Sequence, residues 1–384
     1  MNFMMQLRNS TVDRNSIRGF SLVELMIAMT LGLVLTSSMI AVFLGNKRTS
    51  EVNTAMANIQ ENARFALDSI ARDARVSGFQ GCIDINSEQL SVRSNNAPVT
   101  SGGLRATSAH ASIINSDGSW TPASPIGFTP STTFPQVAGT HALTLQFGDQ
   151  RIANLDEPMM ISGTVIPSNA LPIQLSRPMS ELGLRVGDIA IISNCDVGDL
   201  FTVTTGSADS TLAHAATGGD DSNASPNLTV AYGLNDTLTQ TSVMRLNTNV
   251  YYIGDTGQTN ANGDVITALY RQTWPFEASN PPTELIEGVE DLRVSFGIRS
   301  NNDTLSYLPP DAAGFNPSNI ESLQVGILMN SFDRVSQDND SSTYELAGQP
   351  VYSGTKYPSA NSVHAGDRRF RLAFNTTIKI RNRR

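Results

Sequence analysis

Histidine and cysteine, which take part in much enzyme and metal chemistry, are few in this chain and widely spaced. None of its histidines belongs to an H-E-x-x-H helix or to a Cys/His ligand set. The chain also lacks the G-x-x-x-x-G-K-S/T, G-x-G-x-x-G and G-x-S-x-G patterns of nucleotide hydrolysis, dinucleotide binding and serine hydrolases. We therefore expect no enzyme, no cofactor and no metal site, and no catalytic role for the histidines, which are His110, His141, His214 and His364.

One acidic segment, residues 338–345, has the residue types of a calcium loop. It lacks the glycine and the ligand spacing of an EF-hand, so a solvated acidic loop is the alternative interpretation. The two cysteines, Cys82 and Cys195, are too few for a multi-cysteine zinc module or a disulfide-dense scaffold.

The composition narrows the class of protein further. Of the 384 residues 40% are hydrophobic, and with the 29 glycines this approaches the ~45–50% of ordinary globular proteins. Charged residues make up only 16%, against about 25% in a typical protein, and Ser, Thr, Asn and Gly take their place, as in extracellular β-rich proteins. The net charge of −9 gives no electrostatic reason to bind phosphates, so we expect no direct nucleic acid binding.

The most informative stretch lies near the N-terminus. A basic segment, residues 1–19, precedes an apolar run, residues 20–44, whose one charge is Glu24. At about 1.5 Å per residue the run can cross a ~30 Å hydrocarbon layer, and the arginines before it favour a cytoplasmic leader. A secretory signal would have a shorter apolar region of about 7–15 residues. A simple single-span anchor leaves Glu24 unexplained, because an acid inside the span costs about 2.5–3.5 kcal/mol.

Residues 19–25, Gly-Phe-Ser-Leu-Val-Glu-Leu, resemble the class III signal of type IV pilins and type II secretion pseudopilins. In that family prepilin peptidase cuts after the glycine and methylates the new N-terminal phenylalanine. The resemblance therefore implies cleavage between Gly19 and Phe20 and N-methylation of Phe20. Glu24 matches the family's fifth mature residue, which implies an ion pair with the amine of a neighbouring subunit during assembly.

Two departures from the family pattern stand out. The leader of 19 residues is longer than is common, although Met4 and Met5 offer later starts. Ala41 occupies the position where major pilins tend to have a helix-breaking proline. Gly32 and Gly45 are then the weak points of the helix, at about 1 kcal/mol each relative to alanine.

After Gly45 the apolar residues recur at spacings of three and four, which predicts an amphipathic continuation of the same helix. Ser77 and Gly78 form the expected stop signal. The predicted stripe is Val52, Met56, Ile59, Ala63, Ala66, Ile70 and Ala74, with Glu51, Gln60, Arg64, Asp68, Arg72 and Asp73 on the other sides. We expect the stripe to pack on a sheet.

Strand patterns dominate the remaining residues, 79–384. They are clearest at residues 143–147, 189–192, 200–204, 250–253, 265–271, 292–298, 323–329 and 370–380. Two long segments rich in Gly, Ser, Thr, Asn and Pro, residues 95–136 and 206–240, are interpreted as inserted or binding loops. The predicted fold class is α+β: a long N-terminal helix packed on an antiparallel sheet domain with long loops. The predicted divisions are a leader (1–19), a transmembrane and filament-core helix (20–44), its amphipathic continuation (45–78) and a β-rich head (79–384).

Four further stretches resemble minor pilins of the PilW type: GFQGC from Gly78, SNCDVGDLFTVT from Ser193, ELIEGVEDLRVSFGI from Glu284 and the closing strand from Arg368. This resemblance implies a structural protein that primes type IV pilus assembly and lies near the filament tip. The implied partners are other minor pilins, the major pilin, a tip adhesin and prepilin peptidase. The implied location is the bacterial inner membrane, with a periplasmic head, and then the extracellular fibre. The alternatives are a J-type pseudopilin of type II secretion and an adhesin or receptor module carried on the pilus.

Two expectations concern the head. Outside the inner membrane thiols are oxidised, so we expect Cys82 and Cys195 to form a disulfide. The basic residues near the C-terminus suggest either a strand with a solvated charged face or a docking surface for an acidic neighbour or anionic lipid. These residues are Arg368, Arg369, Arg371, Lys379, Arg381, Arg383 and Arg384.

Overall fold

A computed structural model describes most of the chain. It covers residues 19–85, 90–99, 103–124, 128, 134–163, 166–204, 209–216, 222–234, 238–276, 280–299, 303–313, 315–355 and 363–382. The predicted leader, apart from Gly19, lies outside the described residues, as do Arg383 and Arg384. The chain forms two units, Met1–Asn53 and Thr54–Arg384, and the dividing point lies inside the first helix.

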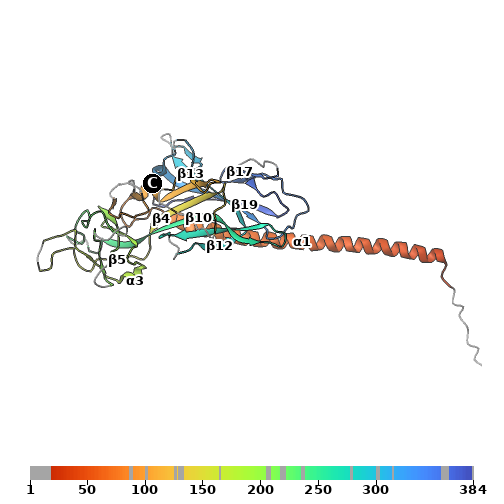
Figure 1. Cartoon of the computed structure of the whole chain (residues 1–384), viewed down its shortest axis with the longest axis horizontal. Helices are drawn as coiled ribbons and strands as arrows, with labels where there is room; N and C mark the ends of the chain where they lie inside the picture. The colour runs from red at the N-terminus through yellow and green to blue at the C-terminus, as the bar shows by residue number, and fades with distance from the viewer. Residues whose placement is uncertain are drawn as a thin grey trace, which may run out of the picture. The chain divides into compact units, whose positions relative to one another are not determined.

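One uninterrupted helix, α1 (Leu22–Val76), contains both predicted helical segments in its 55 residues (Figure 1). No proline breaks it, and Gly32 and Gly45 lie within it. Its apolar side chains from Leu22 to Leu44 are exposed. Among the described residues, α1 is the one helix long and apolar enough to cross a membrane.

The second half of α1 buries the predicted stripe. Ile59, Ala63, Ala66, Ile70 and Ala74 are all buried, as the spacing predicts, while Val52 and Met56 are half-buried. The five buried residues share one core with side chains from strands of two different sheets. Three of the five buried positions are alanines, which allow the helix backbone to approach the strands closely.

The larger sheet has ten strands arranged around β10 (Ser242–Thr259), whose 18 residues pair with four other strands. The first residues of β10 pair with β7 and β5, its middle with β4, and its last part with β11 in a long hairpin. The other strands of this sheet are β1 (Leu90–Val92), β2 (Ala109–Ile114), β3 (Trp120–Thr121), β4 (His141–Gly148), β5 (Ala153–Asn154), β7 (Ile189–Ser193), β8 (Gly198–Thr202), β11 (Val265–Thr273) and β12 (Thr283–Glu287).

The second sheet is antiparallel, in the order β14 (Leu305–Leu308), β13 (Val289–Arg299), β15 (Ile320–Asn330) and β19 (Arg371–Lys379). Its apolar side chains pack on α1 in the shared core. Small sheets join β16 (Tyr344–Leu346), β17 (Gln349–Ser353) and β18 (Val363–His364), and β6 (Ile173–Gln174) with β9 (Thr211–Leu212). The remaining short elements are α2 (Gly103–Thr107), α3 (Met179–Leu182) and η3 (Pro317–Asn319).

The segment between β4 and β10 has its own hydrophobic core, which includes Leu155, Phe201, Leu212, Leu228 and Tyr232. The α+β fold class is therefore confirmed: a long apolar helix packs on mostly antiparallel strands. All eight predicted strands correspond to strands in the structure, although residues 250–253 are only a short piece of β10.

The interpretation of residues 95–136 and 206–240 as loops is wrong in part. The first segment contains α2, β2 and β3, and the second contains β9 and part of a hydrophobic core. Strand β2 was missed because five of its six residues are buried, so the alternation of polar and apolar residues that marks a half-exposed strand is absent. Two of them, His110 and Ser112, are polar side chains inside the fold.

Candidate functional site

The candidate site begins at the start of α1, where Gly19 and Phe20 precede the helix and Phe20 is 85% exposed. Ser21 caps the helix, because its carbonyl accepts the first helical hydrogen bond from the Leu25 amide at 3.1 Å. Glu24, three residues on, accepts a hydrogen bond from the Ser21 amide at 3.4 Å. This is half of a capping box, and it places a carboxylate beside the positive end of the helix dipole.

The other polar side chains of the apolar half are satisfied within their own helix. Four hydroxyls donate to backbone carbonyls three or four residues earlier: those of Thr30, Thr36, Ser37 and Ser38. Such bonds let a hydroxyl enter an apolar environment without a partner chain. Glu24 differs, because one long hydrogen bond leaves most of the capacity of its carboxylate unused.

The predicted cysteine pair is joined in the head. Cys82 follows the end of α1, and Cys195 lies in the turn between β7 and β8, with a Cα–Cα separation of 4.7 Å. Asn194 shapes that turn by accepting hydrogen bonds from the amides of Asp196 and Val197. The disulfide links residues 113 positions apart, so it ties the segment after the helix to the larger sheet.

We expect the double variant Cys82→Ser/Cys195→Ser to lose up to about 4–5 kcal/mol of unfolding free energy, because closing a long loop restricts the unfolded chain. Urea unfolding of the full chain in detergent measures this loss. Adding a reductant should lower the urea midpoint of the wild type toward that of the variant and leave the variant unchanged. Equal midpoints for variant and unreduced wild type would contradict a stabilising bond.

A buried acid fixes the second half of α1 to the larger sheet. The Asp73 carboxylate accepts hydrogen bonds from the Tyr251 hydroxyl at 2.6 Å and from the side-chain carboxamide of Asn249 at 2.7 Å. Burial, followed by the charge and hydrogen bond of Asp73, raises the pKa of Tyr251, so the hydroxyl stays a donor. Asp73 lies outside the predicted apolar stripe, yet it is buried as well, because only 8% of the residue is exposed.

The end of α1 is closed by distant parts of the chain. The Arg381 amide donates to the Arg75 carbonyl, and the side chain of Asn382 donates to the Val76 carbonyl, each at 3.2 Å. The Gly78 amide donates to the Gln146 carbonyl at 2.8 Å. These bonds satisfy groups that the end of a helix leaves open.

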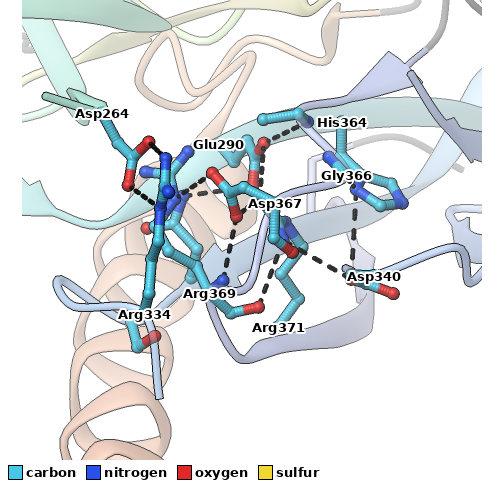
Figure 2. A network of polar contacts seen from close by, with 12 residues as sticks. Asp264, Glu290, Arg334, Asp340, His364, Gly366, Asp367, Arg369 and Arg371 are labelled. Atoms are coloured by element: carbon cyan, nitrogen blue, oxygen red, sulfur yellow. Dashed lines mark hydrogen bonds and ion pairs between the residues drawn. The ribbon is translucent and has the colours of Figure 1, made fainter. Parts of the chain in front are cut away.

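The C-terminal basic residues do not form one solvated or docking surface. Arg369 and Arg371 are 6% and 3% exposed, because carboxylates surround them (Figure 2). Arg371 donates to both oxygens of Glu290, at 2.7 and 3.3 Å, and to Asp367 at 2.7 Å. Lys379 and Arg381 are exposed, as the solvated-face interpretation expects. The error at Arg369 and Arg371 arose because the acids that pair with them lie in other segments.

This cluster links the two sheets. Arg369 donates to Asp367 and to the Val265 carbonyl at the start of β11, and Arg334 pairs with Asp264 in the β10–β11 hairpin (Figure 2). Burial alone would raise the pKa of Glu290, but the charge and hydrogen bonds of Arg371 lower it overall. These groups therefore form a structural ion-pair network.

Several other titratable side chains are buried or have structural partners. Burial lowers the pKa of His110 to about 4. The His141 ring accepts a hydrogen bond from the Val294 amide at 3.1 Å. In the acidic segment, the Asp340 carboxylate accepts bonds from Ser342 and Tyr344. Within the described residues no three His, Cys, Asp or Glu side chains form a group that could hold a metal ion.

Comparison with known proteins bears on both ends of the chain. Residues 14–40 match the family model for the prokaryotic N-terminal methylation motif, and residues 250–382 match that for the type IV pilus-assembly protein W family, PilW. No curated protein matches the chain. A type IV-like pilin from Thermus thermophilus shares 13% identity over 36% of this chain and 67% of its own, with a TM-score of 0.18.

The two family models cover separate regions: one covers the start of α1 with Gly19, Phe20 and Glu24, and the other the sheet that holds the buried arginines. The first region is the segment that methylated pilins share, and the second is specific to one type of pilus-assembly protein. These two matches together support a type IV pilin of the PilW type.

Proposed function

We propose that this protein is a minor pilin that primes type IV pilus assembly and lies near the filament tip. Before assembly it would sit in the inner membrane with its head in the periplasm. Prepilin peptidase would cleave it between Gly19 and Phe20 and methylate Phe20. The observation that carries this proposal is Glu24: it is the one side chain of the apolar half whose polar capacity its own helix does not satisfy.

The physical role of Glu24 follows from its position. Cleavage would create an amine at Phe20, and in a bundle of apolar helices the Glu24 carboxylate of one subunit could pair with the amine of the next. Each charge would offset the burial of the other, whereas an unpaired charge in such a bundle is strongly unfavourable. The pair would therefore set the axial register of the subunits, and other minor pilins and the major pilin would be its direct partners.

We expect Glu24→Ala to be inserted in the membrane normally but incorporated into pili at least about tenfold less, since losing 1.4 kcal/mol at each contact already corresponds to a factor of ten. Immunoblots of sheared pili and of membrane fractions measure the two quantities. Glu51→Ala is the matched control, because Glu51 lies on the same helix and makes only an exposed contact with Lys47 at 3.7 Å. Normal incorporation of the Glu24 variant would contradict the proposal.

The processing step has its own test. Mass analysis of the N-terminal peptide of the mature protein should find N-methylated Phe20, and a strain without prepilin peptidase should retain the leader. An unprocessed chain in the wild-type strain would favour the single-span anchor.

No catalytic activity is part of the proposal, since none of the histidines and cysteines in the described residues lies in an arrangement suited to catalysis. The J-type pseudopilin remains an alternative, separated from the minor pilin by whether the protein is recovered in pili or in the secretion apparatus.

A further inference from the structure

A cavity with a volume of about 830 Å³ lies in the head, and no residue of α1 lines it. Small-molecule sites typically measure about 300–1,000 Å³. Its walls are formed by the residues after α3, by strand β10 and by the turn after β11. Its side chains include three guanidinium groups, two carboxylates and an indole ring, those of Arg151, Arg185, Arg245, Asp188, Asp209 and Trp274.

Two of the guanidinium groups are held in place. Arg245 donates to Asp188 at 2.9 Å, and its Nε is buried with no acceptor among the described residues. The Arg151 guanidinium donates two hydrogen bonds to the Asp149 carboxylate, of 3.2 and 2.9 Å. Although burial opposes ionisation, the hydrogen bonds from Arg151 lower the pKa of Asp149 to about 2, so this pair stays charged.

Gly183 gives Arg151 its position. Gly183 ends α3 with a φ of 67°, in the left-handed region. A Cβ atom there would lie 2.7 Å from one terminal nitrogen of Arg151 and 2.8 Å from the other. The guanidinium therefore lies directly over a glycine in the cavity wall, and a larger residue would displace it.

Arg185 is the unused cation of the cavity. Its backbone amide donates to Asp188, but its side chain is exposed and has no ion pair or hydrogen bond within the described part of the chain. Both oxygens of Asp188 are occupied, by this amide and by Arg245. The cavity thus offers one free guanidinium that could bind a carboxylate in a bidentate manner.

The remaining wall offers both hydrogen-bond donors and acceptors. Asp209 accepts from the Ser180 hydroxyl at 2.7 Å and keeps capacity for a further donor, and the Asn96 carboxamide makes no hydrogen bond to another described residue. A ligand with several negative charges would be repelled by Asp209. A ligand that combines a single carboxylate with several hydroxyl groups could bind the free guanidinium and also pair with the hydrogen-bond donors and acceptors of the wall. Trp274, of which 9% is exposed and the rest packs in a hydrophobic core, adds a small apolar patch to the wall.

We propose that this cavity binds an acidic saccharide unit, with its carboxylate on Arg185. Its hydroxyls donate to Asp209 and accept from Arg245, and its ring lies beside the small part of Trp274 that reaches the cavity. A concave site of this size, with mixed hydrogen-bonding groups, suits a small ligand better than a segment of a neighbouring pilin. The inference goes beyond the assembly role and does not depend on it.

The test uses the full chain in detergent micelles. The chain has two tryptophans, so Trp120→Phe leaves Trp274 as the only fluorescent reporter, inside the cavity. Titration with D-galacturonic acid should give a saturable change in Trp274 fluorescence, and D-galactose should bind at least tenfold more weakly. Isothermal titration of the wild type gives the same comparison if the Trp120 variant folds poorly.

Arg185→Gln should weaken galacturonate binding at least tenfold, and because the Arg185 side chain has no partner among the described residues, the urea midpoint should not change. Arg177→Gln is the matched control: Arg177 is exposed, precedes the same short helix and does not line the cavity. It should bind galacturonate as the wild type does. Neither variant should alter incorporation into pili, so failure of this inference is distinct from failure of the assembly role.

Three results would overturn the inference. If galacturonate binding does not saturate up to about 50 mM, the affinity is weaker than millimolar and the site is excluded. Equal binding of galactose and galacturonate would exclude the carboxylate contact. Equal or tighter binding of N-acetylglutamate would identify an acidic protein segment as the ligand in place of a saccharide.

Discussion

Replacing Arg371 with methionine is expected to destabilise the head by about 3–5 kcal/mol at pH 7, because the change leaves largely buried carboxylates without their cation. Arg371 is fully buried and reaches Glu290, Asp367 and, at 3.6 Å, Asp340. Methionine fills a similar volume, so the loss reflects charge more than packing. Urea unfolding followed by near-UV circular dichroism measures it.

Lys379→Met is the matched control, because Lys379 is an exposed cation on the same strand. Surface substitutions of this kind change stability by about 0.5 kcal/mol or less. A similar loss in both variants would show that net charge, and not the buried network, is responsible.

The loss in Arg371→Met should also depend on pH. In the wild type, the pKa values of Glu290 and Asp367 are lowered. Burial alone would raise both values, but the charges and hydrogen bonds of neighbouring groups, Arg371 among them, lower them by more. Their stabilisation is therefore complete above the ordinary carboxyl pKa of about 4 and is lost as the pH falls through the lowered values. Without Arg371 the buried carboxyls protonate more readily, so the difference between variant and wild type should shrink as the pH is lowered from 7 to 4. A difference of constant size would contradict the ion-pair explanation.

Asp73→Ala is expected to cost about 2–5 kcal/mol, since two buried donors, on Tyr251 and Asn249, lose their acceptor and each unpaired group costs about 1–3 kcal/mol. The same urea experiment measures the loss. Asp68→Ala on the exposed side of the helix is the control, because Asp68 makes only a surface contact with Arg64 at 3.9 Å.

A double-mutant cycle isolates the contact between helix and sheet. Once Tyr251→Phe has removed one donor, Asp73→Ala should cost less than it does in the wild-type background. Strictly additive losses would mean that the hydrogen bond between Asp73 and Tyr251 contributes no coupling energy.

Local patterns predicted the elements of this fold well. The spacing of Ile59, Ala63, Ala66, Ile70 and Ala74 identified the buried side of α1, since a helical stripe depends only on residues three and four apart. The residues around Glu24 likewise lie within one short segment. For that reason the prediction of a processing and assembly site at the start of α1 depends on local sequence alone.

The sequence was less informative wherever burial depends on distant partners. Asp73 and Arg371 are charged residues of a kind that usually lies at the surface. Asp73 is buried against a tyrosine almost 180 positions away, and Arg371 is buried against an acid 81 positions away. The cavity beside Gly183 could not be predicted either, because the residues that line it come from at least five separate segments. Such groupings follow from the topology of β10 and not from any local pattern.

The bonds from Arg381 and Asn382 to the end of α1 have a consequence for biosynthesis. Translation produces this helix first and the residues that close it last. The carbonyls at the end of α1 therefore stay open until residues about 300 positions later have been made, and a product that stops before Arg381 should have a frayed helix end that is a target for proteases. For the same reason a purification tag belongs in a surface turn such as the one at Gly263, and not next to Asn382.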